Sequence, residues 1–83
     1  MKYGYYIDLD ERGSFVADVR DEAGNTVFEV RAGDQLGEDE CSIFEDGYMR
    51  DKHDLSGLQE YLRSIKVIGV SDTIVSMEEF EAV

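Results

Sequence analysis

The fold is set by the alternating stretch Lys2-Tyr3-Gly4-Tyr5-Tyr6-Ile7-Asp8-Leu9-Asp10 and by the segments Ser14–Arg20 and Thr26–Arg31 that follow it. Alternate positions of these segments are apolar, and a period of two residues is typical of a strand with one buried face. The positions expected to face inward are Tyr3, Tyr5, Ile7, Leu9, Phe15, Ala17, Val19, Phe28 and Val30. Short turns at Asp10–Gly13 and Asp21–Asn25 separate the segments, which predicts an antiparallel three-stranded meander.

The pattern weakens from Gly33 to Asp54. The segment Gly33–Glu40 is polar and rich in carboxylates, and it is expected to be a loop. Cys41–Glu45 could pair as a short fourth strand before Asp46-Gly47 turns the chain. A stretch of this length without firm structure is long for a compact domain, so it is a candidate functional loop.

Helical spacing returns after Asp54, which is a suitable N-cap residue. An apolar stripe through Leu58 and Leu62 predicts a helix from about Leu55 to Lys66. Thr73–Val75 has the composition of a short strand, and Ser76 with Glu79 has the spacing of a cap for a last helix over 77–82. The expected fold is a single acidic α+β domain over residues 1–83. It is an antiparallel meander of three to four strands, packed by one main helix, with a short C-terminal helix.

Charge is the strongest functional signal in this chain. Its 83 residues carry 20 acidic and 8 basic side chains, for a formal net charge of −12 at pH 7. Such a field repels nucleic acid and anionic membranes, and it attracts basic surfaces. We therefore expect a basic, nucleic-acid-binding protein or complex as the partner, with no direct binding to nucleic acid and no membrane association.

The candidate partner-binding residues are the carboxylates on the outer strand face, in the hairpin loops and in the long loop, together with two tyrosines expected to be exposed. They are Asp8, Asp10, Glu11, Asp18, Asp21, Glu22, Glu29, Glu38, Asp39, Glu40, Glu45, Asp46, Tyr6 and Tyr48. Carboxylates two residues apart on a strand are separated by about 6.7 Å. Phosphates recur about every 3.4 Å along one DNA strand, so this spacing corresponds to every second phosphate. A solvated acidic surface without a partner is the alternative interpretation.

Catalytic and metal-binding chemistry finds little support in the sequence. An EF-hand loop starting at Asp8 would need an acidic or amide residue where Arg12 stands and a Glu where Val19 stands. His53 and Cys41, the single residues of their kinds, are too few for a zinc site, and carboxylates beside Cys41 disfavour its thiolate. We expect no enzymatic activity, no cofactor and no metal.

The whole-chain character resembles the small acidic anti-CRISPR and anti-restriction proteins of phages and mobile elements. The resemblance lies in small size, surplus carboxylates and clusters such as Gly37-Glu38-Asp39-Glu40 and Phe44-Glu45-Asp46. It implies a DNA-mimicking inhibitor that occupies a basic groove, such as the DNA channel of a CRISPR surveillance complex.

A second resemblance concerns the opening segment from Tyr5 to Ala17, which is similar to the first hairpin of HicB-type antitoxins. The Leu-Pro-Gly-Cys-type segment of that family is missing, and the chain has no proline. This resemblance implies an alternative function, the neutralisation of a basic RNA-cleaving toxin.

The sequence also leads us to expect a soluble protein of the bacterial cytoplasm. No apolar run approaches the roughly 20 residues that cross a bilayer. A single cysteine is ordinary for a reducing compartment. Either a monomer or a homodimer fits the sequence.

Overall fold

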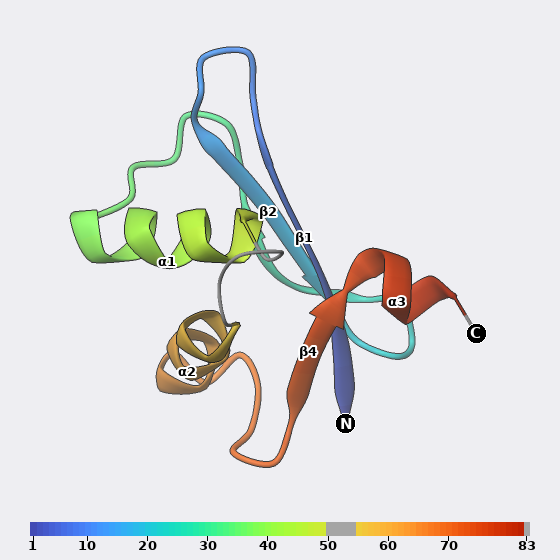
Figure 1. The fold of residues 1–83 in the computed structure, drawn as a ribbon. Helices are drawn as coiled ribbons and strands as arrows, with labels where there is room; N and C mark the ends of the chain where they lie inside the picture. Colours follow the sequence, from blue (N-terminus) through green and yellow to red (C-terminus); the bar gives the residue numbers. More distant parts are fainter. Residues whose placement is uncertain (50–54, 83) are drawn as a thin grey trace.

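A computed structural model describes residues 1–49 and 55–82 (Figure 1). The elements follow in the order β1 (Lys2–Leu9), β2 (Phe15–Arg20), β3 (Thr26–Val30), α1 (Glu38–Tyr48), α2 (Ser56–Ser64), β4 (Thr73–Ser76) and α3 (Met77–Glu81). The predicted α+β class is confirmed. None of the helices in the described ranges is long and apolar enough to span a membrane.

The sheet has the strand order β3-β2-β1-β4. The predicted meander is confirmed, since β2 pairs antiparallel with both β1 and β3. The short strand predicted at Thr73–Val75 is also present, as β4. It lies parallel to β1, with Tyr3 opposite Ile74, so the expectation of a purely antiparallel sheet was wrong.

Both hairpins of the meander are closed by the same hydrogen-bond pattern. Asp10 donates its N–H to the carbonyl of Ser14, and its carboxylate accepts the N–H groups of Arg12 and Ser14. Asp21 makes the equivalent bonds in the second loop. Gly13 and Gly24 have positive φ, which glycine adopts without a Cβ penalty. An Asp at the start and a Gly at the fourth position therefore fix both turns.

The segment expected to be a loop forms helix α1. Its first turn carries Glu38, Asp39 and Glu40, where negative charge is favourable beside the positive end of the helix dipole. Phe44 and Gly47 are buried on the opposite side. The predicted polar loop at Gly33–Glu40 was therefore wrong for residues 38–40, and the predicted short strand at Cys41–Glu45 was wrong throughout. With α1 at 11 residues and α2 at 9, the expectation of one main helix was also wrong.

Helices lie on both sides of the sheet (Figure 1). Helices α1 and α2 pack against the inner face, where Phe44 stacks on Phe28 at a ring distance of 6.2 Å. Helix α3 lies against the opposite face, where Phe80 sits directly over Gly4. The buried apolar core consists of Tyr5, Ala17, Val19, Val30, Phe44, Leu58, Leu62, Ile68 and Ile74. The predicted facing of the strands is thus confirmed for most positions, but Leu9 is 40% exposed.

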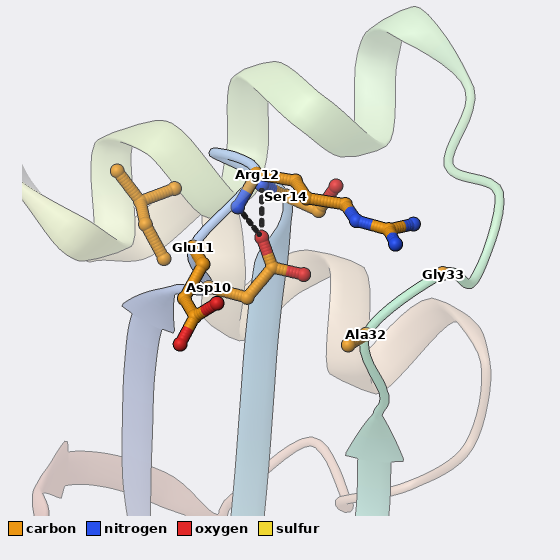
Figure 2. Close-up of a pocket in the computed structure, with 7 residues that line it drawn as sticks. Asp10, Glu11, Arg12, Ser14, Ala32 and Gly33 are labelled. Atoms are coloured by element: carbon orange, nitrogen blue, oxygen red, sulfur yellow. Dashed lines mark hydrogen bonds between the residues drawn. The ribbon is translucent and has the colours of Figure 1, made fainter.

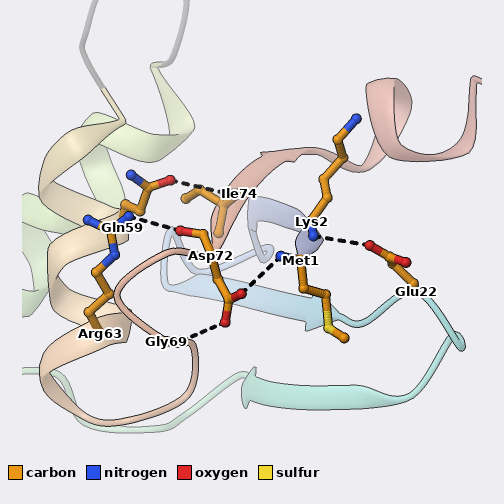
Figure 3. A network of polar contacts seen from close by, with 8 residues as sticks. All are labelled: Met1, Lys2, Glu22, Gln59, Arg63, Gly69, Asp72 and Ile74. Atoms are coloured by element: carbon orange, nitrogen blue, oxygen red, sulfur yellow. Dashed lines mark hydrogen bonds and ion pairs between the residues drawn. The ribbon is translucent and has the colours of Figure 1, made fainter.

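Polar side chains from α2 hold the outer edge of β4 (Figure 3). The carbonyl oxygen of the Gln59 side chain accepts the N–H of Ile74, and the Arg63 guanidinium donates to the carbonyl of Asp72. The carboxylate of Asp72 in turn accepts the N–H of Gly69 and pairs with the Met1 amino group at 3.1 Å. The predicted helix cap Asp54 lies outside the described residues. For α3, the predicted cap is confirmed, because the Ser76 hydroxyl accepts the N–H of Glu79.

Candidate protein-binding surface

Four carboxylates form a stripe along α1, and we call this set the acidic stripe: Glu38, Asp39, Glu45 and Asp46. All four residues are exposed, and they lie within about 120° of arc around the helix axis, opposite the buried Phe44 and Gly47. The two pairs are seven residues apart, which is about 10.5 Å along the axis. Three nucleotides of a DNA strand span about the same distance.

The charge along the segment that contains this stripe is of one sign. Residues 32–49 contain six acidic side chains and no Lys, Arg or His. They contribute −6, half of the formal net charge of −12. No basic residue lies in the last turn of α1 either, although cations are favoured there. The helix dipole therefore favours Glu38 and Asp39 in the first turn, but it does not favour Glu45 and Asp46 near the end of α1.

The fifth predicted carboxylate of this region, Glu40, is used inside the molecule. One of its oxygens accepts the hydroxyl of Tyr61 at 2.7 Å, and the other accepts the N–H of Gly37 at 3.4 Å. Burial of the phenol and its bond to Glu40 raise the pKa of Tyr61 to about 12. Since Tyr61 lies on α2, this bond fixes the start of α1 to its neighbour and holds the acidic stripe in one orientation.

The outer sheet face also brings together predicted residues, but their charges are largely compensated. Asp18 lies opposite both Tyr6 and Glu29 in the strand register. Arg20 pairs with Asp18 at 2.9 Å, and Arg31 pairs with Glu29. These arginines separate carboxylates that would otherwise repel each other across neighbouring strands. The outer face is therefore a mixed-charge surface rather than a row of free carboxylates.

The third carboxylate of this face, Asp8, is also engaged. Its oxygens accept the Tyr6 hydroxyl at 2.7 Å and the N–H of Leu9 at 2.8 Å. The bond from Tyr6 and then the bond from Leu9 lower the pKa of Asp8, and the same contact raises the pKa of Tyr6. Both shifts favour a phenol that donates to a charged carboxylate at neutral pH.

The predicted loop carboxylates divide into structural and exposed ones. The carboxylate of Asp10 holds its turn by accepting backbone N–H groups (Figure 2), and the carboxylate of Asp21 does the same in the second loop. Glu11 is exposed beside Asp10, at an open hollow of about 680 Å³ whose lining includes Arg12. Glu22 is exposed and accepts the N–H of Lys2. The hairpin loops thus present Glu11 and Glu22 to solvent, while the carboxylates of Asp10 and Asp21 are used to hold the turns.

Exposed apolar groups lie near the end of β1 and at the end of α1. Tyr6 and Tyr48 are 50% and 38% exposed, which confirms that they reach the surface. The strand pattern placed Leu9 in the core, and it missed that this residue is open to solvent. It missed Leu9 because alternation identifies a face of the sheet but does not show where the covering helices stop.

No group of three or more potential metal ligands occurs among residues 1–49 and 55–82. Cys41 is a half-buried free thiol, and His53 lies outside the described ranges. No protein-family model matches the sequence, and comparisons with curated proteins and with solved structures give no significant match.

Proposed function

We propose that this protein is a non-enzymatic inhibitor of a basic, nucleic-acid-binding protein or complex. Its carboxylates would occupy the positions at which the target binds the phosphates of nucleic acid. The observation that carries the proposal is the acidic stripe on α1, within a segment of six acidic residues and no basic one. A CRISPR surveillance complex, with its positively charged DNA channel, represents the expected class of target.

The proposal assigns the main electrostatic contact to α1 rather than to the outer sheet face. On the sheet, Asp18 already pairs with Arg20, and Glu29 pairs with Arg31 just after β3. A partner would have to break these pairs before it gained new ones. On α1, the bond between Glu40 and Tyr61 fixes the helix while leaving the stripe exposed, so little ordering is required on binding.

Two triple variants with the same change in charge test this assignment. One is Glu38→Gln with Asp39→Asn and Glu45→Gln, and the matched control is Glu11→Gln with Glu79→Gln and Glu81→Gln. All six residues are exposed. Each variant is immobilised and used to capture proteins from a bacterial lysate at low and high salt, with DNA or RNA added as competitor.

We expect the parent to capture a nucleic-acid-binding protein that salt and added nucleic acid release. The α1 variant should bind it roughly tenfold more weakly, since each exposed ion pair contributes about 0.2–1 kcal/mol. Equal losses in both variants would show that only net charge matters, and no loss in either would refute the mimicry. Capture of a single small RNA-cleaving protein would favour the antitoxin function instead.

A further inference from the structure

Among residues 1–49 and 55–82, no strand pairs with the second half of β1 on the side where β4 lies. Strand β1 extends to Leu9, but β4 pairs only with its first part, from Lys2 to Tyr5. After Ser76 the chain turns into α3 and leaves the edge (Figure 1). The second part, Tyr6 to Leu9, pairs with β2 on one side. On its other side, no described strand continues the line of β4.

The hydrogen-bond alternation shows which backbone groups point to the vacated side. Asp10 donates its N–H to the carbonyl of Ser14 in the β1–β2 hairpin, so the backbone groups of the even-numbered residues of β1 face β2. The carbonyl of Met1 accepts the N–H of Thr73, so the odd-numbered residues face β4. The N–H and C=O of Ile7 are therefore directed to the open side. The N–H of Leu9 is already taken by the Asp8 carboxylate.

Side chains suited to a contact border this edge. Tyr6, Leu9 and Tyr48 are among the most exposed large apolar residues of the described chain. Where β4 ends, a hollow of about 240 Å³ is lined by residues that include Ile7, Gly47 and Met77. Its volume can accept a side chain from an added strand. Tyrosine is enriched among the residues that contribute most to binding at protein interfaces.

The charge of the surroundings selects the kind of occupant. The residues of the edge and its hollow belong to the segments 5–9, 45–48 and 76–78, and none of these contains Lys, Arg or His. Asp8, Glu45 and Glu78 belong to these segments. A second copy of this chain would bring the same sign of charge to the edge, whereas a basic segment would be attracted.

We propose that an extended, basic segment of the partner adds as a strand beside Tyr6–Leu9, in line with β4. The basic character of the segment rests on the proposed function, and the strand addition rests on the open edge. Backbone bonds to Ile7 supply register, and alternate side chains reach the hollow at Met77 and the exposed ring of Tyr6, as in other cases of strand addition.

The test uses a synthetic peptide of alternating arginine and valine, eight residues long, titrated into the isotopically labelled protein and followed by NMR. A second peptide carries N-methyl groups on alternate residues, which removes the donors of one edge without changing charge. The amide resonances of Ile7 and Leu9 should move most, and the Ile7 amide should become protected from hydrogen exchange. The N-methylated peptide should bind about tenfold more weakly, the effect expected for the loss of one or two hydrogen bonds.

Matched variants locate the contact on the protein. Tyr6→Ala and Leu9→Ala should each weaken binding several-fold. Ile65→Ala and Val70→Ala, which remove side chains that are 42% and 88% exposed elsewhere, should not. Circular dichroism of each variant confirms that the fold is retained.

The outcomes separate this inference from the proposed function. Shifts confined to α1, or equal binding of both peptides, would overturn strand addition and leave the acidic stripe as the contact. Edge shifts that persist in the triple α1 variant would support strand addition as a contact that does not depend on the acidic stripe, whose role is tested separately by capture of the target. Concentration-dependent shifts of Ile7 without peptide would show that a second copy is the occupant, and the inference would be wrong.

Discussion

The substitution Gly4→Ala tests how helix α3 is held on the sheet. Gly4 is buried in β1, and a Cβ placed there would lie 2.7 Å from Cγ and Cδ2 of Phe80 and 2.9 Å from its Cβ. Carbon atoms pack at about 3.5–4.0 Å, so the ring and its own Cβ must retreat by roughly 1 Å. Because the Cβ belongs to the helix, α3 has to move with it.

Two opposing terms set the size of the effect. Gly4 is not among the glycines with positive φ, so alanine fits its backbone and should add about 0.5–1 kcal/mol by restricting the unfolded chain. Overpacking costs about 1–3 kcal/mol. The upper limit is the loss of Phe80 packing, which for a half-buried ring is about half of the 3–5 kcal/mol found for full burial. We expect a net loss of about 0.5–2 kcal/mol.

Urea unfolding of a double-mutant cycle measures this coupling. Phe80→Ala alone should destabilise the protein, and adding Gly4→Ala to it should be neutral or stabilising, because the overlapping ring is gone. The two substitutions should thus be non-additive by about 1–3 kcal/mol, within the range seen for residues in contact. If Gly4→Ala stabilises the parent, or if the two effects simply add, the close approach of α3 to β1 described above is wrong.

Two further predictions concern polar contacts. Tyr61→Phe removes the bond to Glu40 and should lower the free energy of unfolding by about 1–2 kcal/mol at neutral pH, with Tyr48→Phe as the control. Because the pKa of Tyr61 is raised, the stability that its hydroxyl contributes is fully present at pH values below the ordinary tyrosine pKa, and it is lost as the pH rises toward about 12. The melting temperatures of the parent and of Tyr61→Phe should therefore converge at alkaline pH. The pKa of Asp72 is lowered, chiefly by the N–H of Gly69 and then by the Met1 amino group. The stability that Asp72 contributes is therefore present at pH values above the ordinary carboxyl pKa and is lost in acid. Asp72→Asn should therefore melt at a lower temperature than the parent at pH 6 and approach it as the pH falls below 4, and an unchanged difference across that range would contradict this role.

Local sequence patterns were sufficient to predict the meander, because its information is local. Period-two alternation identifies the buried faces, and the Asp and Gly of each hairpin determine turns that close within five residues. The capping residue Ser76 is equally local, since its hydroxyl binds an N–H three residues away.

Helix α1 was missed because its apolar positions are few and its sequence is dominated by carboxylates. Phe44 and Gly47 form the buried side, and glycine at that position conceals the helical period. The close approach of the helix explains the glycine, since a Cβ there would lie 2.7 Å from the Ile7 Cδ1. That contact is between elements far apart in sequence, so no local pattern could reveal it.

The parallel pairing of β4 with β1 could not be predicted from local sequence patterns either. The same holds for which basic residue pairs with each carboxylate. Four residues do not specify which strand they join or in which direction. Asp18 and Glu29 were predicted on the same face and lie opposite each other in the register, but Arg20 and Arg31 were not recognised as their partners. Glu38, Asp39, Glu45 and Asp46 lie on one side of the molecule only because residues 38–48 form a helix.

The pairing of β1 with β4 joins the first and last strands of the sheet in sequence order. Until Thr73–Ser76 leave the ribosome, the sheet consists of the three-stranded meander alone, and the helix that covers Gly4 has not formed. Contacts between distant segments slow folding and make it cooperative. We therefore expect residues 1–82 to fold as one unit only after β4 and α3 have been synthesised, and removal of β4 and α3 to abolish the whole fold rather than to leave a stable meander.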